Sequence, residues 1–205
     1  SYVLTPTDIA NGYVTITPST AMADGVHQVA AQLVDQAGNA SALSTAFNLT
    51  IDTVKPVITI TDEHSNNTTS TLAKAGDIIT TNFTSTDPDL KVTIGGQPAT
   101  VTLVNAATNT YQATFTVPAS GATQGPANVV IEARDVAGNV TISTLPGTVT
   151  IDTLAPSATA TVSHIYDAIS AVEINSGGVN TAHNVLTLTG SITGTLASEI
   201  GRAHV

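Results

Sequence analysis

Apolar and polar residues alternate along short segments in the middle of the chain, most clearly in 78–85, 111–117 and 129–133. Successive side chains of a β-strand point to opposite faces, so each segment predicts a strand with one apolar and one polar face. The predicted apolar faces carry Ile79, Phe83, Tyr111, Ala113, Phe115, Val117, Val129, Ile131 and Ala133. Seven short strands can be counted from Lys55 to Thr153, which is the number typical of a β-sandwich.

One predicted hairpin lies around the sequence Gly95-Gly96-Gln97-Pro98. Glycines adopt the positive φ values of tight turns, and proline is found at the edges or starts of strands. We therefore expect the apolar segment 90–94 to pair with the segment 99–104 across this turn.

Two turn sequences, Asp35-Gln-Ala-Gly-Asn39 and Asp135-Val-Ala-Gly-Asn139, lie one hundred residues apart. Each is followed at the same distance by a similar terminator, Thr50-Ile-Asp-Thr-Val-Lys-Pro56 and Thr150-Ile-Asp-Thr-Leu-Ala-Pro156. A period of about one hundred residues exceeds the roughly 20–50 residues of a solenoid repeat, but it matches one independently folding β-sandwich. The sequence therefore predicts an all-β fold made of tandem antiparallel β-sandwiches.

The positions of the repeats predict how the chain is divided. Residues 1–54 align with the second half of a repeat, with Tyr13 at a core position, and 55–154 form a complete repeat. Residues 155–199 begin a further, related repeat. The last residues, 200–205, can be back-translated into a common sequencing-adapter sequence, so we expect them to be an artefact and exclude them from the fold.

Composition limits the classes of function. The net charge of −10 disfavours binding to nucleic acid and to anionic lipid. There is no run of about 18 apolar residues, so insertion into a membrane is not expected. Without cysteine the chain has no disulfide framework and no thiolate chemistry. The carboxylates fall mostly at predicted turns and strand ends, where they could converge on a hard cation.

The two turns, their terminators and the segment Asp87-Pro-Asp-Leu-Lys-Val-Thr-Ile-Gly-Gly96 together resemble the bacterial immunoglobulin-like (BIg-type) tandem repeats of large surface adhesins and biofilm-associated proteins. The resemblance implies an immunoglobulin-like sandwich acting as an extracellular stalk segment at the cell surface. Its partners would be neighbouring repeats of the same chain, while a separate domain would contact the host or biofilm surface. It also implies Ca²⁺ near the junctions between repeats.

Ca²⁺ takes roughly six to eight oxygen ligands, and carboxylates and amide carbonyls are among them. The candidate ligands are Asp35, Asn39, Asp52, Asp62, Asp135, Asn139, Asp152 and Asp167. We expect each turn to lie near the end where its own repeat leaves for the next, with Asp62 and Asp167 completing the shells. A metal-free interpretation stays open, because Asp and Asn also form such turns by bonding to local backbone groups.

The sequence also bears on two other classes of function, catalysis and ligand binding. Catalysis is not expected, since Ser, His and Asp occur without a recognisable catalytic motif. The scattered histidines, which we interpret as surface residues, are His27, His64, His164 and His183. The alternative is a ligand- or carbohydrate-binding β-sandwich module of a secreted protein, although such sites generally use exposed aromatic platforms and the chain has no Trp.

Overall fold

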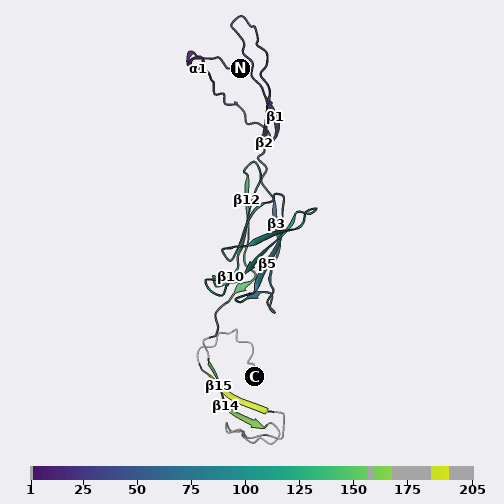
Figure 1. Ribbon diagram of the computed structural model, residues 1–205, viewed down its shortest axis with the longest axis vertical. Helices are drawn as coiled ribbons and strands as arrows, with labels where there is room; N and C mark the ends of the chain where they lie inside the picture. The colour runs from purple at the N-terminus through teal and green to yellow at the C-terminus, as the bar shows by residue number, and fades with distance from the viewer. Residues whose placement is uncertain (1, 157–158, 168–185, 194–205) are drawn as a thin grey trace. The chain divides into compact units, whose positions relative to one another are not determined.

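The computed structural model describes residues 2–156 with their side chains and the backbone of 159–167 and 186–193 (Figure 1). The chain divides into two compact units, Ser1–Asp152 and Thr153–Val205. The narrower domain boundaries expected from the repeats stay predictions, and the suspected artefact at 200–205 lies outside the described residues.

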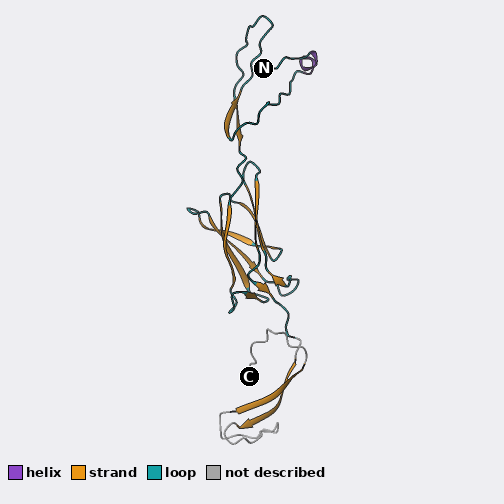
Figure 2. Cartoon of the chain, turned by 180° about the vertical axis from the view of Figure 1, so that it is seen from behind, coloured by secondary structure: helices purple, strands orange, loops and turns teal. Residues whose placement is uncertain are grey.

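Two four-stranded sheets build the sandwich in the middle of the chain (Figure 2). The first has the order β3 (Ile58–Ser65), β5 (Ile78–Ser85), β9 (Thr110–Thr116) and β8 (Thr100–Asn105). The second has the order β12 (Val140–Leu145), β11 (Val129–Arg134), β6 (Asp89–Ile94) and β7 (Gln97–Pro98). All neighbours in both sheets are antiparallel.

A third, small sheet lies where the chain leaves the sandwich. Its order is β10 (Gly125–Pro126), β13 (Thr150–Ile151) and β4 (Leu72–Ala73). The pair β13–β4 is parallel, unlike the pairs of the two large sheets. The sandwich thus contains eleven strands, β3 to β13, whereas the sequence predicts seven. The number is higher because bulges, glycines and prolines interrupt the ladders.

The core confirms the predicted alternation. Residues of both large sheets pack into one buried cluster, in which the rings of Phe83 and Tyr111 stack with centroids 5.6 Å apart. Thr81 and Ser85 are also buried on the apolar face of β5. Their hydroxyls donate to the main-chain carbonyls of Asp62 and Asp87, at 2.7 and 2.8 Å, so neither is left unpaired in the core.

The predicted hairpin is correct only at its tip. β6 and β7 pair at Thr93–Pro98 and Ile94–Gln97, after which the chain crosses to the other sheet and Thr100–Asn105 pairs with β9 instead. The last bond of the hairpin is donated by the Ala99 N–H to the Val92 oxygen at 3.0 Å. Pro98 itself has no N–H to donate to a ladder. The crossing lets Val101 pack against the core cluster.

The first part of the chain is less regular. It holds β1 (Gly25–Val29) paired with β2 (Phe47–Ile51), and a one-and-a-half-turn helix α1 (Pro6–Asn11) that the sequence analysis did not predict. The signal for α1 is Thr5-Pro-Thr-Asp8: Thr5 and Asp8 form a reciprocal capping box and Pro6 occupies the first turn.

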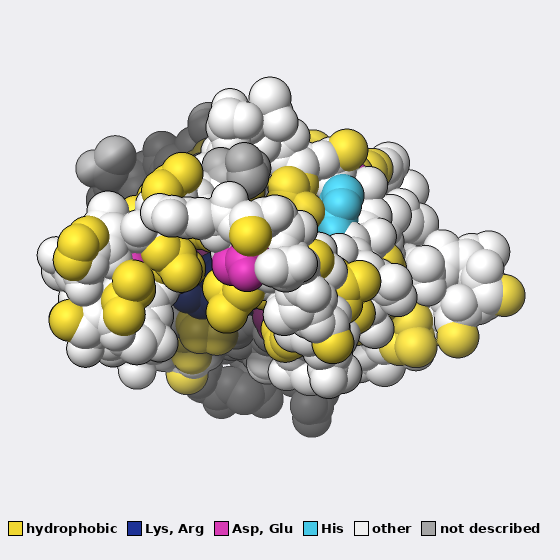
Figure 3. All heavy atoms as spheres, turned by 90° about the horizontal axis from the view of Figure 1, so that it is seen from above, with side chains coloured by type: hydrophobic (Ala, Val, Ile, Leu, Met, Phe, Trp, Pro, Cys, Tyr) yellow, Lys and Arg dark blue, Asp and Glu magenta, His cyan; other side chains and the backbone are white. Residues whose placement is uncertain are grey.

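The expectation that Tyr13 takes a core position is wrong in this chain, since its side chain is 68% exposed. No residue from 2 to 51 is buried. Within the described residues β1 and β2 have no second sheet to cover them, so apolar side chains remain at the surface. Figure 3 shows one face on which many hydrophobic side chains lie at the surface and charged side chains are few.

The second unit contains the antiparallel pair β14 (Thr159–Asp167) and β15 (Leu186–Thr193), with a register shift between Val162 and His164. Both strands lie within 155–199, where the sequence predicts the beginning of a further repeat.

Replacing Gly147 with alanine should destabilise the sandwich by about 2–3 kcal/mol through overpacking. An added Cβ would lie 2.5 Å from the Ala127 nitrogen, which is backbone and cannot move aside like a flexible side chain. Chemical denaturation measures the effect, and the exposed Thr144→Ala on the preceding strand is the control. Equal midpoints for the two variants would contradict the prediction.

Candidate functional site

The turn at Asp35–Asn39 is closed by its own acidic side chain. The Asn39 main-chain N–H donates to Asp35 Oδ1 at 2.8 Å, and Asn39 Nδ2 donates to Asp35 Oδ2 at 2.9 Å. Gly38, at φ 91°, takes the left-handed position that side chains disfavour. The hydrogen bonds from Asn39, its side-chain amide first, lower the pKa of Asp35.

The turn at Asp135–Asn139 repeats this geometry. Both bonds from Asn139 to the Asp135 carboxylate are 2.8 Å long, and Gly138 has φ 95°. The Asn139 side-chain amide is again the main reason that the pKa of Asp135 is lowered. The repeat in sequence is therefore a repeat in structure, and each carboxylate is already occupied within its turn.

The second turn has contacts that the first does not show. Asn139 Nδ2 also donates to the main-chain oxygens of Asp52 and Val54, at 3.0 and 3.4 Å, and Thr141 Oγ1 donates to the Pro56 oxygen at 2.6 Å. The turn thus lies where the chain enters the sandwich, beside Asp52. We had expected it near Asp152, where the chain leaves.

Other polar groups of the segment 52–56 are bonded as well. The N–H and hydroxyl of Thr53 donate to Asp24 Oδ1 at 3.0 and 2.9 Å, and the Val54 N–H donates to Asp52 Oδ1 at 3.0 Å. Pro56 is buried. The Asp52 carboxylate is therefore part of a local turn, as in the metal-free interpretation of these aspartates.

The described residues do not fit a calcium shell at this junction. Among them, no three His, Asp or Glu side chains gather closely enough to hold a metal ion. The amide nitrogen of Asn139 occupies the point at which three oxygens converge. These are Asp135 Oδ2 and the main-chain oxygens of Asp52 and Val54. A cation there would require the Asn139 side chain to move.

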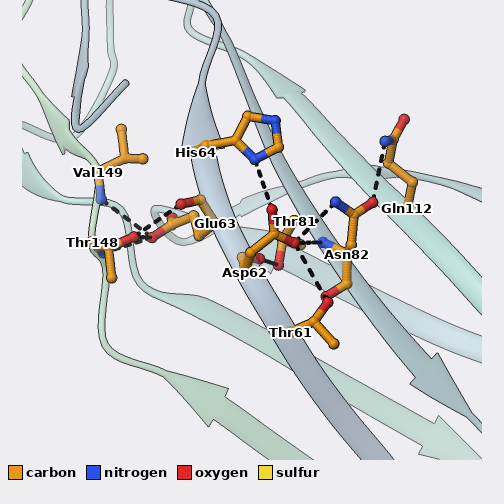
Figure 4. Close-up of polar contacts among 9 residues, drawn as sticks. All are labelled: Thr61, Asp62, Glu63, His64, Thr81, Asn82, Gln112, Thr148 and Val149. Carbon is orange, nitrogen blue, oxygen red and sulfur yellow. Dashed lines mark hydrogen bonds and ion pairs between the residues drawn. The ribbon is translucent and has the colours of Figure 1, made fainter. Parts of the chain in front are cut away.

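The remaining candidate ligands lie apart from this junction. Asp62 sits at a bulge of β3, where its oxygens accept from Asn82 Nδ2 at 2.9 Å and contact His64 Nδ1 at 2.9 Å (Figure 4). Asp152 donates its main-chain N–H to the Ala73 oxygen at 2.8 Å. Asp167 is the last residue of β14, and its side chain lies outside the described part of the structure.

Glu63, the neighbour of Asp62, is a carboxylate that the sequence analysis missed. Its Oε2 accepts from the Thr148 N–H at 2.6 Å, the Thr148 hydroxyl at 3.0 Å and the Val149 N–H at 3.2 Å (Figure 4). It thereby joins β3 to the segment before β13. No local pattern could reveal this pairing, since its partners lie 85 residues away.

A hollow on the outer side of β11 and β12 is lined by Asn128, Val130, Thr144, Leu145 and Pro146. None of these residues is aromatic or titratable. The hollow therefore has neither the stacking surface expected for a sugar nor a group for acid–base chemistry. No helix in the described residues is long and apolar enough to cross a membrane.

The fold is an all-β antiparallel sandwich of the immunoglobulin-like class. Residues 2–53 match the family model of the bacterial Ig-like domain. The resemblance expected from the turns and terminators is thus confirmed. No curated protein matches the chain. Bacterial Ig-like domains occur in surface proteins and are typically non-enzymatic.

Replacing Glu63 with glutamine should lower the free energy of unfolding by about 1–2 kcal/mol, because hydrogen bonds to a charged acceptor are stronger than those to a neutral one. Glu132→Gln is the control, since the Glu132 carboxylate forms an ion pair with Arg134 at 3.7 Å near the surface, and exposed pairs contribute little. Equal shifts in the denaturation midpoints of both variants would show that Glu63 does not join the two segments as described.

Asp77 predicts a pH dependence. Its carboxylate accepts from Asn67 Nδ2 at 2.6 Å and from the Lys74 N–H at 2.8 Å, and these bonds lower its pKa. Its contribution is therefore fully present above the unfolded pKa of about 3.9 and is lost as the pH falls through the lower, folded value.

At pH 7 we expect Asp77→Asn to be about 1–2 kcal/mol less stable than the natural chain. The difference should shrink as the pH falls below about 4, in denaturation experiments across that range. The exposed Asp89→Asn is the control. A difference that stays constant with pH would contradict the role of the ionised carboxylate.

Proposed function

We propose that the chain is an extender segment of a bacterial cell-surface adhesin, in which Ig-like sandwiches follow one another along a stalk. The observation that carries the proposal is the second Asp–Asn turn, which repeats the first and bonds to the linker between the two copies. The linker is hydrogen-bonded to the sandwich that follows it. Such bonding would limit bending at the junction, which a stiff extender requires.

The proposal assigns no reaction to the chain. Among the described residues, the polar network of Glu63 joins β3 to the segment before β13, and that of Asn139 joins a turn to the linker. Binding to a host or biofilm surface would belong to a separate domain, and the direct partners would be neighbouring repeats of the same chain. The proposed location is extracellular, at the cell surface.

Calcium at the junctions stays a prediction from the family resemblance. At the segment 52–56 the described residues do not fit it, so the proposed extender function includes no calcium step. Of the other candidate ligands, Asp35 and Asp62 have carboxylates that already accept hydrogen bonds from protein groups.

One observation favours the alternative of a ligand- or carbohydrate-binding module. The residues Tyr2 and Tyr13 are 47% and 68% exposed, and their rings could present aromatic faces to a sugar. In Tyr2 the hydroxyl donates to Asp8 Oδ2 at 3.1 Å. In the sandwich, by contrast, Tyr111 is buried and its ring packs in the core, where it is not available to a sugar.

A display experiment tests the extender function. The chain is anchored on cells by its C-terminus, with a fluorescent epitope at its N-terminus, and the distance from the epitope to the membrane is measured. A second copy of residues 55–154 should add at least about 26 Å, the length of an eight-residue strand at roughly 3.3 Å per residue. No increase in distance would contradict the extender function.

The same displayed chain separates the two functions. An extender should not bind a glycan array or host cells by itself. Binding that is lost in Tyr13→Ala and kept in Tyr111→Phe would favour the carbohydrate-binding alternative instead.

A further inference from the structure

Three oxygen atoms converge on one amide nitrogen where the chain enters the sandwich. Asn139 Nδ2 lies 2.8 Å from Asp135 Oδ2, 3.0 Å from the Asp52 oxygen and 3.4 Å from the Val54 oxygen. All three are acceptors, and the amide group carries two hydrogens. Its amino side must therefore face them, because the amide oxygen in that position would meet three further acceptors.

We infer that Asn139 and Thr141 form a metal-independent latch that binds the main chain of the segment 52–56 and holds the linker on the sandwich. The name latch is used below for these two side chains. The inference rests on the proposed extender function, since it explains how a junction between repeats is kept stiff.

The amide fills the position to which the three oxygens point, at 2.8, 3.0 and 3.4 Å from its nitrogen. A cation could bind these oxygens only if the Asn139 side chain moved away. The amino group supplies the positive end of a dipole to these acceptors. The Asp135 carboxylate then acts as a positioning group, which accepts from both the side chain and the main chain of Asn139.

The linker is held along its whole length. Asn139 binds the oxygens of Asp52 and Val54, and Thr141 binds that of Pro56. One residue further on, the Val57 N–H donates to Thr86 Oγ1 at 3.0 Å. The ring of Pro56 fixes its φ, which reduces the conformational freedom that the latch must remove.

The first turn provides a matched control within the same chain. Asn39 makes the same bonds to Asp35, at 2.8 and 2.9 Å, and both residues are exposed. In the second turn Asp135 and Asn139 are half-buried. A substitution at Asn39 thus removes the same turn bonds without touching the segment 52–56.

Nuclear magnetic resonance relaxation on the full chain tests the latch. In the natural protein the amides of Val54 and Lys55 should have order parameters of about 0.85, the value of rigid backbone, with or without EDTA. In Asn139→Ala combined with Thr141→Val they should fall below about 0.6. Each single variant should give a smaller decrease, and Asn39→Ala should give none.

Two results would overturn the inference. If EDTA alone lowers the order parameters of Val54 and Lys55 in the natural protein, a cation holds the junction. If the double variant leaves them unchanged while the amides of β5 and β11 keep their natural shifts, the folded sandwich does not need the latch. Either result leaves the display experiment unaffected, so failure of the latch can be told apart from failure of the extender function.

Discussion

A β-sheet with one apolar face needs a second layer to cover it, and this constraint explains most of the described structure. In the middle of the chain β3-β5-β9-β8 faces β12-β11-β6-β7, and side chains from both sheets bury one another. The first segment has only β1 and β2 in regular pairing, and its apolar side chains stay exposed. The first segment and the sandwich are related by sequence but differ in how much apolar surface they bury. The reason is that, among the described residues, only the sandwich has two sheets facing each other.

A second constraint applies at the junction before the sandwich. The main-chain polar groups of an ordered linker need hydrogen-bond partners. The carbonyls of Asp52, Val54 and Pro56 receive them from Asn139 and Thr141. An amide is well suited to this position because its amino group can serve several acceptors while the neighbouring Asp135 fixes its orientation. In the proposed latch, the stiffness of the junction arises from side chains of the sandwich that follows the linker, Asn139 and Thr141.

The carboxylates divide by environment. Those of Asp35 and Asp135 close turns, Glu63 joins β3 to the segment before β13, and Asp62 belongs to a network at a bulge. The same acidic side chain can close a turn or bind a cation, and the sequence does not distinguish the two. What decides is which donors the fold brings within hydrogen-bond distance. In the described residues these donors are main-chain N–H groups, side-chain amides and hydroxyls.

The sequence by itself determined the β-sandwich, the inward side chains of β5, β9 and β11, and the repeated turn, because alternation and turn chemistry are local properties. It also carried the signal of the bacterial Ig-like family. Only the tertiary structure decided that Thr100–Asn105 joins the other sheet, that Tyr13 is exposed, and that the Asp135 turn meets Asp52. These outcomes depend on groups far apart in the chain, such as Asn139 and Asp52, whose proximity no local pattern encodes.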